Sequence, residues 1–277
     1  MEVMIAMNMQ SGIAEVNGTR LYYETAGSGH PLIFVHGFGL DSRMWEDQFE
    51  AFAQRYQVVR YDLRGFGKSA LPTAEGYSHA EDLCALLAHL GIAEASVLGL
   101  SMGGWIATNF ALVYPDKIRA LILADSALIG FQWSSEWNRL WAAIQAAEAE
   151  VGIEAARQLW LGHPLFTPAL EQAEVAARLA RIVSDYSGWH WDHSDSHRAI
   201  EPPDIQRIDQ ITSPTLVIIG ERDLPDFQDM ATTLQQRIPN ANLVRLPGVG
   251  HMTNMEAPER FNEVARHFLR ALHDGDS

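Results

Sequence analysis

The sequence predicts an α/β protein in which a mostly parallel β-sheet carries helices on both faces and is interrupted by a helical insertion. Apolar runs alternate with helical patterns over residues 13–124, and the same alternation returns near residue 215. The stretch between them shows no clear strand. We therefore expect a core domain built from residues 1–126 and 206–277, with an α-helical cap over residues 127–205.

The composition is that of an ordinary soluble globular protein, with 47% hydrophobic and 20% charged residues among 277. The formal net charge of −15 repels phosphate backbones, so we expect no nucleic-acid partner. No apolar run reaches the about 18 residues that span a bilayer, so we expect no membrane partner. The single cysteine, Cys84, permits no intrachain disulfide, and residues 1–12 lack the basic residues of a secretory signal. Both observations favour a cytoplasmic protein.

The elements of the first half follow from periodicity and turn signals. Asn17-Gly18 lies between alternating residues and predicts a β-hairpin at the N-terminus. Continuous apolar runs predict buried strands at 32–35, 57–61, 95–98 and 118–124. Amphipathic patterns predict helices over 44–56, from Ser78 to Gly91, and from the residues after Ser101 to near Tyr114.

The second half begins with the insertion. Trp133, Trp137 and Trp141 recur every four residues and predict one helical stripe. Further helices are expected over 152–161 and 168–186. The sheet pattern then resumes with strands at 215–219 and 242–246 and helices at 226–237 and 257–272.

The link between strand 95–98 and the following helix has the pattern Gly-x-Ser-x-Gly, with Ser101 at its centre. Gly99 and Gly103 remove the Cβ atoms that would clash in so sharp a strand-to-helix turn. The serine then stands at a helix start, where backbone N–H groups can meet a developing negative charge. A glycine-rich turn with an incidental serine is the alternative, but the flanking strand and helix favour a nucleophile.

Ser101, Asp223 and His251 each follow a predicted parallel strand. Because the carboxyl ends of such strands meet at one edge of the sheet, we expect the three side chains to converge. A serine hydroxyl needs a neighbouring base, and a neutral histidine can accept its proton. Asp223 would fix the tautomer of His251 and stabilise its charged form.

Other residues compete for these roles. Asp226 and Asp125 are alternative acids. His36 is an alternative base, although we interpret it as a brace for the loop that presents Phe38. Gly67-Lys68-Ser69 matches the tail of a phosphate loop, but Asp62 stands where that motif needs glycine, so Asp62 and Arg64 more simply brace a turn.

The insertion also contains polar residues with metal-binding side chains. They are His190, Asp192, His193, Asp195 and His197. Their spacing fits no standard zinc pattern, so we interpret them as a solvated polar loop and expect no metal site.

The order Ser, Asp, His, with a nucleophile elbow and a cap, resembles the α/β-hydrolase family over nearly the whole chain. The matching motifs are His36-Gly37, the segment Asp62–Ser69, Gly99-x-Ser101-x-Gly103, Gly220-x-x-Asp223 and Gly250-His251. Within the family, the chain looks most like capped carboxylesterases and 3-oxoadipate enol-lactonase-type enzymes. The resemblance implies an α/β-hydrolase fold and a serine esterase that forms an acyl-enzyme without a cofactor. It also implies oxyanion donors at the N–H groups of Phe38 and Met102.

The substrate is expected to be a small-molecule ester or lactone. Trp105, Trp133 and Trp137 are candidate substrate-binding residues, which favours an apolar or aromatic group, although a core packing role explains the tryptophans of the insertion equally well. The three histidines of the insertion, together with Arg198, would instead admit an anionic lactone. Three other activities remain open on the same scaffold: hydrolysis of a carbon–carbon bond, hydroxynitrile lysis and non-catalytic ligand binding. Serine at the elbow argues against the dehalogenase and epoxide hydrolase relatives, which attack with aspartate.

Overall fold

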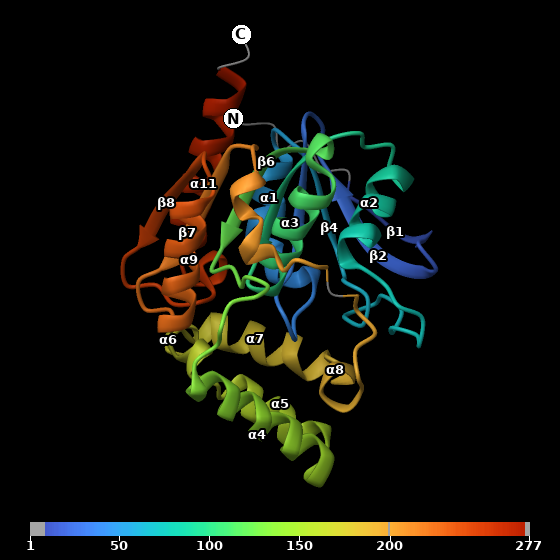
Figure 1. The fold of residues 1–277 in the computed structure, drawn as a ribbon, viewed down its shortest axis with the longest axis vertical. Helices are drawn as coiled ribbons and strands as arrows, with labels where there is room; N and C mark the ends of the chain where they lie inside the picture. The colour runs from blue at the N-terminus through green and yellow to red at the C-terminus, as the bar shows by residue number, and fades with distance from the viewer. Residues whose placement is uncertain (1–8, 199, 275–277) are drawn as a thin grey trace, which may run out of the picture.

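A single eight-stranded sheet runs through the protein in the computed structural model, which describes residues 9–198 and 200–274 (Figure 1). The strand order is β1-β2-β4-β3-β5-β6-β7-β8. β1 pairs antiparallel with β2, and β2 pairs antiparallel with β4, whereas all the remaining neighbours are parallel. This confirms the predicted mostly parallel sheet. The strands are β1 Gln10–Val16, β2 Thr19–Ala26, β3 Pro31–Val35, β4 Gln57–Tyr61, β5 Ala95–Leu100, β6 Ile118–Ala124, β7 Thr215–Gly220 and β8 Ala241–Leu246.

The N-terminal hairpin forms around the predicted turn. Asn17 has φ 47° and Gly18 has φ 68°, the left-handed conformations that a two-residue turn of this kind requires. The prediction that residues 1–12 carry no secretory signal falls partly on residues 1–8, which lie outside the described residues.

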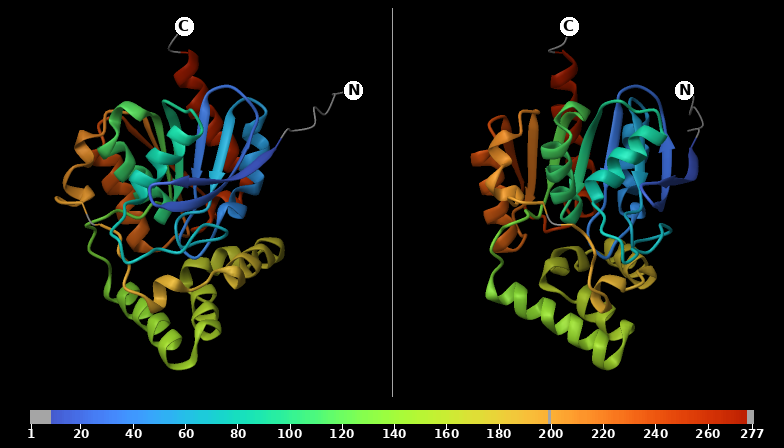
Figure 2. Two further views of the ribbon diagram at one scale, coloured as in Figure 1. Left: turned by 90° about the vertical axis from the view of Figure 1, so that its right-hand side faces the viewer. Right: turned by 45° about the vertical axis from the view of Figure 1, so that its right-hand side comes forward.

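Helices cover both faces of the sheet (Figure 2). α1 packs against α11, and α2 packs against α3. Their bounds are α1 Glu46–Ala53, preceded by the 3₁₀ turn Ser42–Trp45, then α2 His79–His89, α3 Met102–Val113, α9 Pro225–Arg237, α10 Thr253–Glu256 and α11 Pro258–Asp274. Ser78 caps α2 as predicted, because its hydroxyl accepts from the N–H of Glu81. The short helix α10 has no counterpart among the predicted elements.

Residues 127–205 form a helical segment beside the sheet (Figure 1). No strand is assigned in its described residues. Its helices are α4 Ser135–Val151, α5 Ile153–Leu161, α6 Thr167–Leu170, α7 Ala173–Asp185 and α8 Trp189–Asp192. The prediction of a single helix over 168–186 is therefore wrong, because Gln172 adopts an extended backbone and separates α6 from α7.

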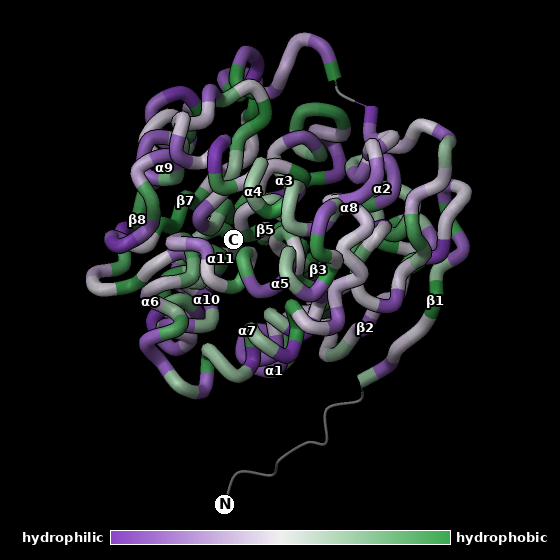
Figure 3. Tube along the Cα trace, turned by 90° about the horizontal axis from the view of Figure 1, so that it is seen from below, coloured by the Kyte–Doolittle hydropathy of each residue, from purple (hydrophilic) through white to green (hydrophobic). Residues whose placement is uncertain are grey.

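The core lies in the centre of the sheet. Every residue of β5 and of β7 is buried, as expected for strands covered on both faces. Figure 3 views the molecule from the side of the helical segment, with β5 labelled near the centre between α4 and α5, and β7 to its left beside β8 and α9. Among the described residues, no helix combines the length and apolarity needed to cross a membrane.

Candidate active site

Ser101 stands in the strained turn that its motif predicts. It has φ 56° and ψ −115°, a backbone conformation that is costly for a residue with a side chain. A Cβ on Gly99 would lie 2.1 Å from the carbonyl oxygen of Gly103, and one on Gly103 would lie 2.1 Å from that of Val35. Both positions therefore require glycine. Ser101 stays partly exposed although the three residues after it are buried.

His251 and Asp223 form a buried pair. Nδ1 of His251 lies 2.8 Å from Oδ2 of Asp223, and the side chains are 2% and 0% exposed. The other Asp223 oxygen accepts from the N–H of Leu224 at 2.7 Å. Burial lowers the pKa of His251 to about 4, although carboxylates at Asp125 and Glu256 act to raise it. The imidazole is therefore neutral at pH 7 and able to accept a proton.

The loop that presents His251 is held by Glu256. One carboxylate oxygen of Glu256 accepts from the N–H of Gly250 at 2.7 Å, and the other accepts from that of Met252 at 3.0 Å. The two bonds bracket His251 from both sides. This clamp was not predicted, because the helix α10 that carries Glu256 is too short to show a periodic pattern.

The alternative acids are engaged elsewhere. The Asp226 carboxylate accepts from the N–H and the hydroxyl of Ser134, at 3.2 and 2.7 Å. Asp125 accepts from the N–H of Gly220 at 2.9 Å and from the hydroxyl of Thr253. Asp223 is thus the carboxylate bonded to His251.

Asp125, Asp223 and His251 are the one group in the described part of the chain whose ligand atoms lie close enough together for a metal ion, within 4.8 Å. The oxygens of both carboxylates already accept hydrogen bonds from protein donors. We therefore interpret the cluster as a hydrogen-bonded unit.

Ser101 lies at the same edge of the sheet as Asp223 and His251, and backbone hydrogen bonds connect the intervening strand ends. Its N–H donates to the carbonyl of Ala124 at the end of β6, and Asp125 donates from its own N–H to Ile218 in β7. Among the described residues, the Ser101 hydroxyl makes no hydrogen bond to His251. Hydrogen bonds of catalytic bases are commonly long before a substrate binds.

The two predicted oxyanion donors belong to segments close to Ser101. Met102 opens α3 directly after it. The loop that carries Phe38 is close as well, because a Cβ on Gly37 would lie 3.5 Å from Cβ of Ser101. His36 braces this loop: Nδ1 donates to the carbonyl of Gly37 at 2.8 Å, and Nε2 accepts from the N–H of Leu63 at 2.9 Å. Both ring nitrogens of His36 are therefore occupied.

The predicted substrate-binding tryptophans fall into two groups. Trp133 and Trp137 stack at 4.3 Å between ring centroids, and both contact Phe227. Phe227 in turn lies 4.4 Å from the ring of His251. Trp105 instead contacts His79 and His197. Phe227 was not predicted, because only the docking of α4 against α9 reveals that it joins the tryptophans to His251.

The interpretation of these histidines as part of a solvated loop was wrong for His190 and His197, whereas His193 is exposed. His190 stacks on Phe66 at 4.5 Å, and His197 stacks on His79 at 5.3 Å. Burial lowers the pKa of His190 to about 4 and also lowers that of His197. Docking of the segment onto the core covers much of these two rings, which the spacing of the residues cannot show.

Arg198 is also not available as a free cation, because its guanidinium forms an ion pair with Glu81. The motif that resembles a phosphate loop is likewise filled by protein. Asp62 accepts from the N–H groups of Ser42 and Lys68 at 2.9 and 2.8 Å, which confirms its bracing role. Arg64 pairs with buried Asp82 at 2.7 Å.

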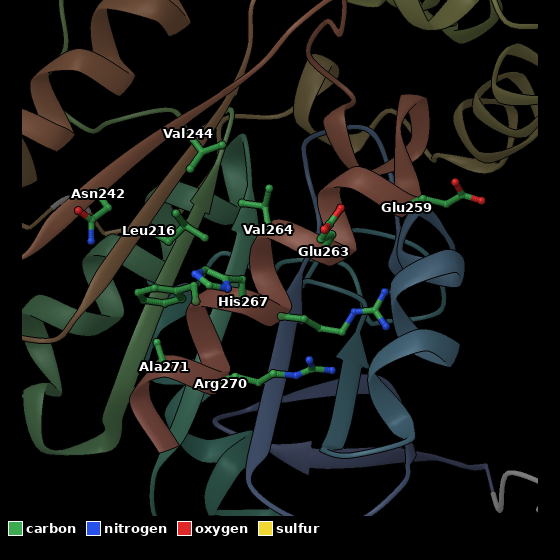
Figure 4. A pocket seen from close by; sticks show the side chains of 11 residues that line it. Leu216, Asn242, Val244, Glu259, Glu263, Val264, His267, Arg270 and Ala271 are labelled. Atoms are coloured by element: carbon green, nitrogen blue, oxygen red, sulfur yellow. The ribbon is translucent and has the colours of Figure 1, made fainter. Parts of the chain in front are cut away.

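A separate groove of about 880 Å³ lies between β8 and α11 (Figure 4). Its floor includes Leu216, Val244 and Val264, and Glu259, Glu263 and Arg270 line its rim. None of the residues that line it belongs to the candidate active site.

Comparisons with known proteins agree with this fold. The chain is 32% identical over 265 residues to the dihydrolipoyllysine-residue acetyltransferase component of an acetoin cleaving system from Pseudomonas putida, covering 93% of this chain and 68% of that protein. The enol-lactonase of Burkholderia xenovorans superposes with a TM-score of 0.79 at 28% identity, covering 94% of this chain and 100% of that one. A thermophilic esterase of Thermogutta terrifontis superposes with a TM-score of 0.81 at 28% identity, covering 95% and 99%. The model of the alpha/beta hydrolase fold family matches residues 30–258. The chain therefore belongs to the α/β-hydrolase fold family.

Proposed function

We propose that the protein is a serine hydrolase of carboxylic esters, with Ser101 as nucleophile, His251 as base and Asp223 as the acid that orients the base. The observation that carries the proposal is the buried His251–Asp223 hydrogen bond at the sheet edge where the Ser101 elbow stands. A neutral, oriented imidazole and a strained, partly exposed serine at one edge of the sheet support acyl transfer.

The reaction would run in two halves. Ser101 Oγ attacks the carbonyl carbon while Nε2 of His251 takes the hydroxyl proton, and the oxyanion accepts hydrogen bonds from the N–H groups of Phe38 and Met102. Collapse breaks the C–O bond, and the leaving alcohol takes the proton from His251. Water then attacks the acyl-serine with His251 again as base, which releases the carboxylic acid and restores Ser101.

For the substrate, we propose a small neutral ester whose apolar or aromatic group packs against Trp133, Trp137 and, on the other side, Trp105. The ion pair of Arg198 with Glu81 and the lowered pKa of His190 support a neutral rather than an anionic ligand. In this proposal residues 127–205 act as a cap that covers the site.

A lactone is the second candidate substrate. The similarity to an enol-lactonase along the full length of that protein favours it. A lactone ring opens by the same two half-reactions, except that the alcohol stays attached to the acyl group until water releases the open hydroxy acid.

Turnover of p-nitrophenyl esters, aryl esters and neutral or anionic lactones by wild type and Ser101→Ala tests the proposal. We expect wild type to hydrolyse neutral esters faster than anionic lactones. Ser101→Ala should hydrolyse neither. Faster turnover of an anionic lactone would replace the ester assignment, and Ser101→Ala with full activity would contradict the serine mechanism.

A further inference from the structure

Asp125 lies beneath the candidate triad without belonging to it. It follows β6 directly, has φ 42° and is 0% exposed. A non-glycine residue at positive φ is costly and persists only where its surroundings hold it there. The contacts of its side chain show what that backbone conformation achieves.

The Asp125 carboxyl ties the end of β6 to the two segments that carry Asp223 and His251. Its Oδ1 accepts from the N–H of Gly220, the last residue of β7 and three positions before Asp223. Its Oδ2 is bonded to the hydroxyl of Thr253, two positions after His251. The N–H of Asp125 itself donates to Ile218 at 2.8 Å. One side chain thus joins the end of β6 to the loops of both the acid and the base.

The charges in this cluster restrict its protonation. The carboxyls of Asp125 and Asp223 and the imidazole of His251 lie within 4.8 Å of one another, away from water. Asp223 is the better candidate for the charge, because it accepts from Nδ1–H of His251 as well as from the N–H of Leu224, and so balances the charge that His251 gains in the reaction. A second buried carboxylate beside it, facing a neutral imidazole, would be strongly unfavourable.

We propose that Asp125 is a positioning residue that carries a proton, and that this neutral carboxyl holds Asp223 and His251 in register while leaving Asp223 as the single negative charge under the imidazole. The inference rests on the proposed function. Burial and the neighbouring charge of Asp223 raise the pKa of Asp125, in the direction that the geometry requires. Burial raises the pKa of Asp223 as well, and hydrogen bonds from the N–H of Leu224 and from Asp125 act to lower it.

Two substitutions separate this role from a purely structural one. In Asp125→Asn, the amide oxygen can accept from Gly220, and the NH₂ group donates where a protonated carboxyl would donate. We expect Asp125→Asn to retain most of kcat. Asp125→Ala loses the hydrogen bonds to both loops, so its kcat should fall by about 10²-fold with little change in KM. Asp125→Asn as inactive as Asp125→Ala would overturn the proposal.

The pH dependence of kcat/KM reports on the charge of Asp125, which a purely structural role of this residue would not affect. The charged and titratable groups that face His251 are Asp223, Asp125, Glu256 and His163, with Arg222 close to Glu256. An ionised Asp125 would raise the pKa of His251, so its replacement by Asn would shift the acid limb of kcat/KM to lower pH. A protonated Asp125 predicts an acid limb that stays in place.

Asp204→Asn is the matched control, because Asp204 is equally buried with a raised pKa but bonds to Asn109 and Arg207. Its acid limb is also expected to stay in place.

The infrared difference spectrum between wild type and Asp125→Asn at pH 7 tests the proton itself. We expect the wild type to contribute a protonated-carboxyl band that the variant lacks, and an ionised-carboxylate band in its place would overturn the proposal. This measurement needs no turnover, so it judges Asp125 even if Ser101→Ala shows that the serine mechanism is wrong.

Discussion

The carboxylate of Asp226 holds Ser134 at the start of α4, accepting from both its N–H and its hydroxyl. Asp223, three positions earlier, bonds to His251 instead. Two acidic residues that look interchangeable along the sequence thus have different partners: one joins the helical segment to the core, and the other orients the imidazole.

Asp223→Asn and Asp226→Asn form a matched pair that tests this division. Asn at 223 cannot hold the histidine in the tautomer that leaves Nε2 free, so we expect kcat to fall by about 10⁴-fold. Asn at 226 keeps an oxygen for Ser134, so its kcat should stay near that of wild type. Steady-state kinetics on p-nitrophenyl acetate measures both, and equal losses in the two variants would contradict the assignment.

Glu256→Gln should change both the rate and the pH dependence. The amide has one accepting oxygen, so only one of the N–H groups of Gly250 and Met252 keeps its partner. We expect kcat to fall by about tenfold or more. Removal of the negative charge lowers the pKa of His251, so the acid limb of kcat/KM moves to lower pH. An acid limb that does not move would show that Glu256 carries no charge near His251.

The wild-type pH profile has a predicted position. Since burial lowers the pKa of His251 to about 4, the base remains neutral through the mildly acidic range. Measurement of kcat/KM from pH 3.5 to 8 should show a plateau that falls only near pH 4. A fall centred near 6.5 would mean that the charge of Asp223, or water that reaches the imidazole, cancels the effect of burial.

His163 provides a separate test of stability. Burial lowers its pKa from 6.5 to about 4, so between these values the unfolded chain binds a proton that the folded chain does not. Wild type therefore loses stability through this group as pH falls below 6.5, by about 1.4 kcal/mol at pH 5.5. In His163→Asn, the side-chain oxygen can still accept from Leu165 N–H, and the variant lacks this linkage.

Thermal melts at pH 7 and 5.5 measure the effect. The Tm of His163→Asn relative to wild type should rise by a few degrees on going to pH 5.5. A difference between the two proteins that does not depend on pH would rule out a depressed pKa for His163.

Trp137→Ala should weaken binding of aromatic esters, because Trp137 packs on Phe227 beside His251. We expect KM for an aryl ester to rise by about tenfold or more, with a smaller effect on an acetate. Trp189→Ala is the control, since Trp189 contacts His190 and His193 instead. Equal effects of the two variants would indicate that Trp137 only packs.

Much of the sheet was predictable because buried parallel strands are continuous apolar runs. The bounds of β4 and β6 agree with their predicted ranges, and the elbow at Ser101 carries the strain that its glycines indicate. What the sequence could not show depends on contacts between distant segments. The choice between Asp223 and Asp226 depends on which one faces Ser134, and the burial of His190 depends on docking against Phe66. Such contacts leave no periodic signal along the chain.

Trapping of the acyl-enzyme addresses the nucleophile most directly. Wild type quenched in acid during turnover of p-nitrophenyl acetate should show, by peptide mass spectrometry, an acetyl group on Ser101, and Ser101→Ala should show none. Acetylation of another residue that persists in Ser101→Ala, together with undiminished turnover, would contradict Ser101 as the nucleophile.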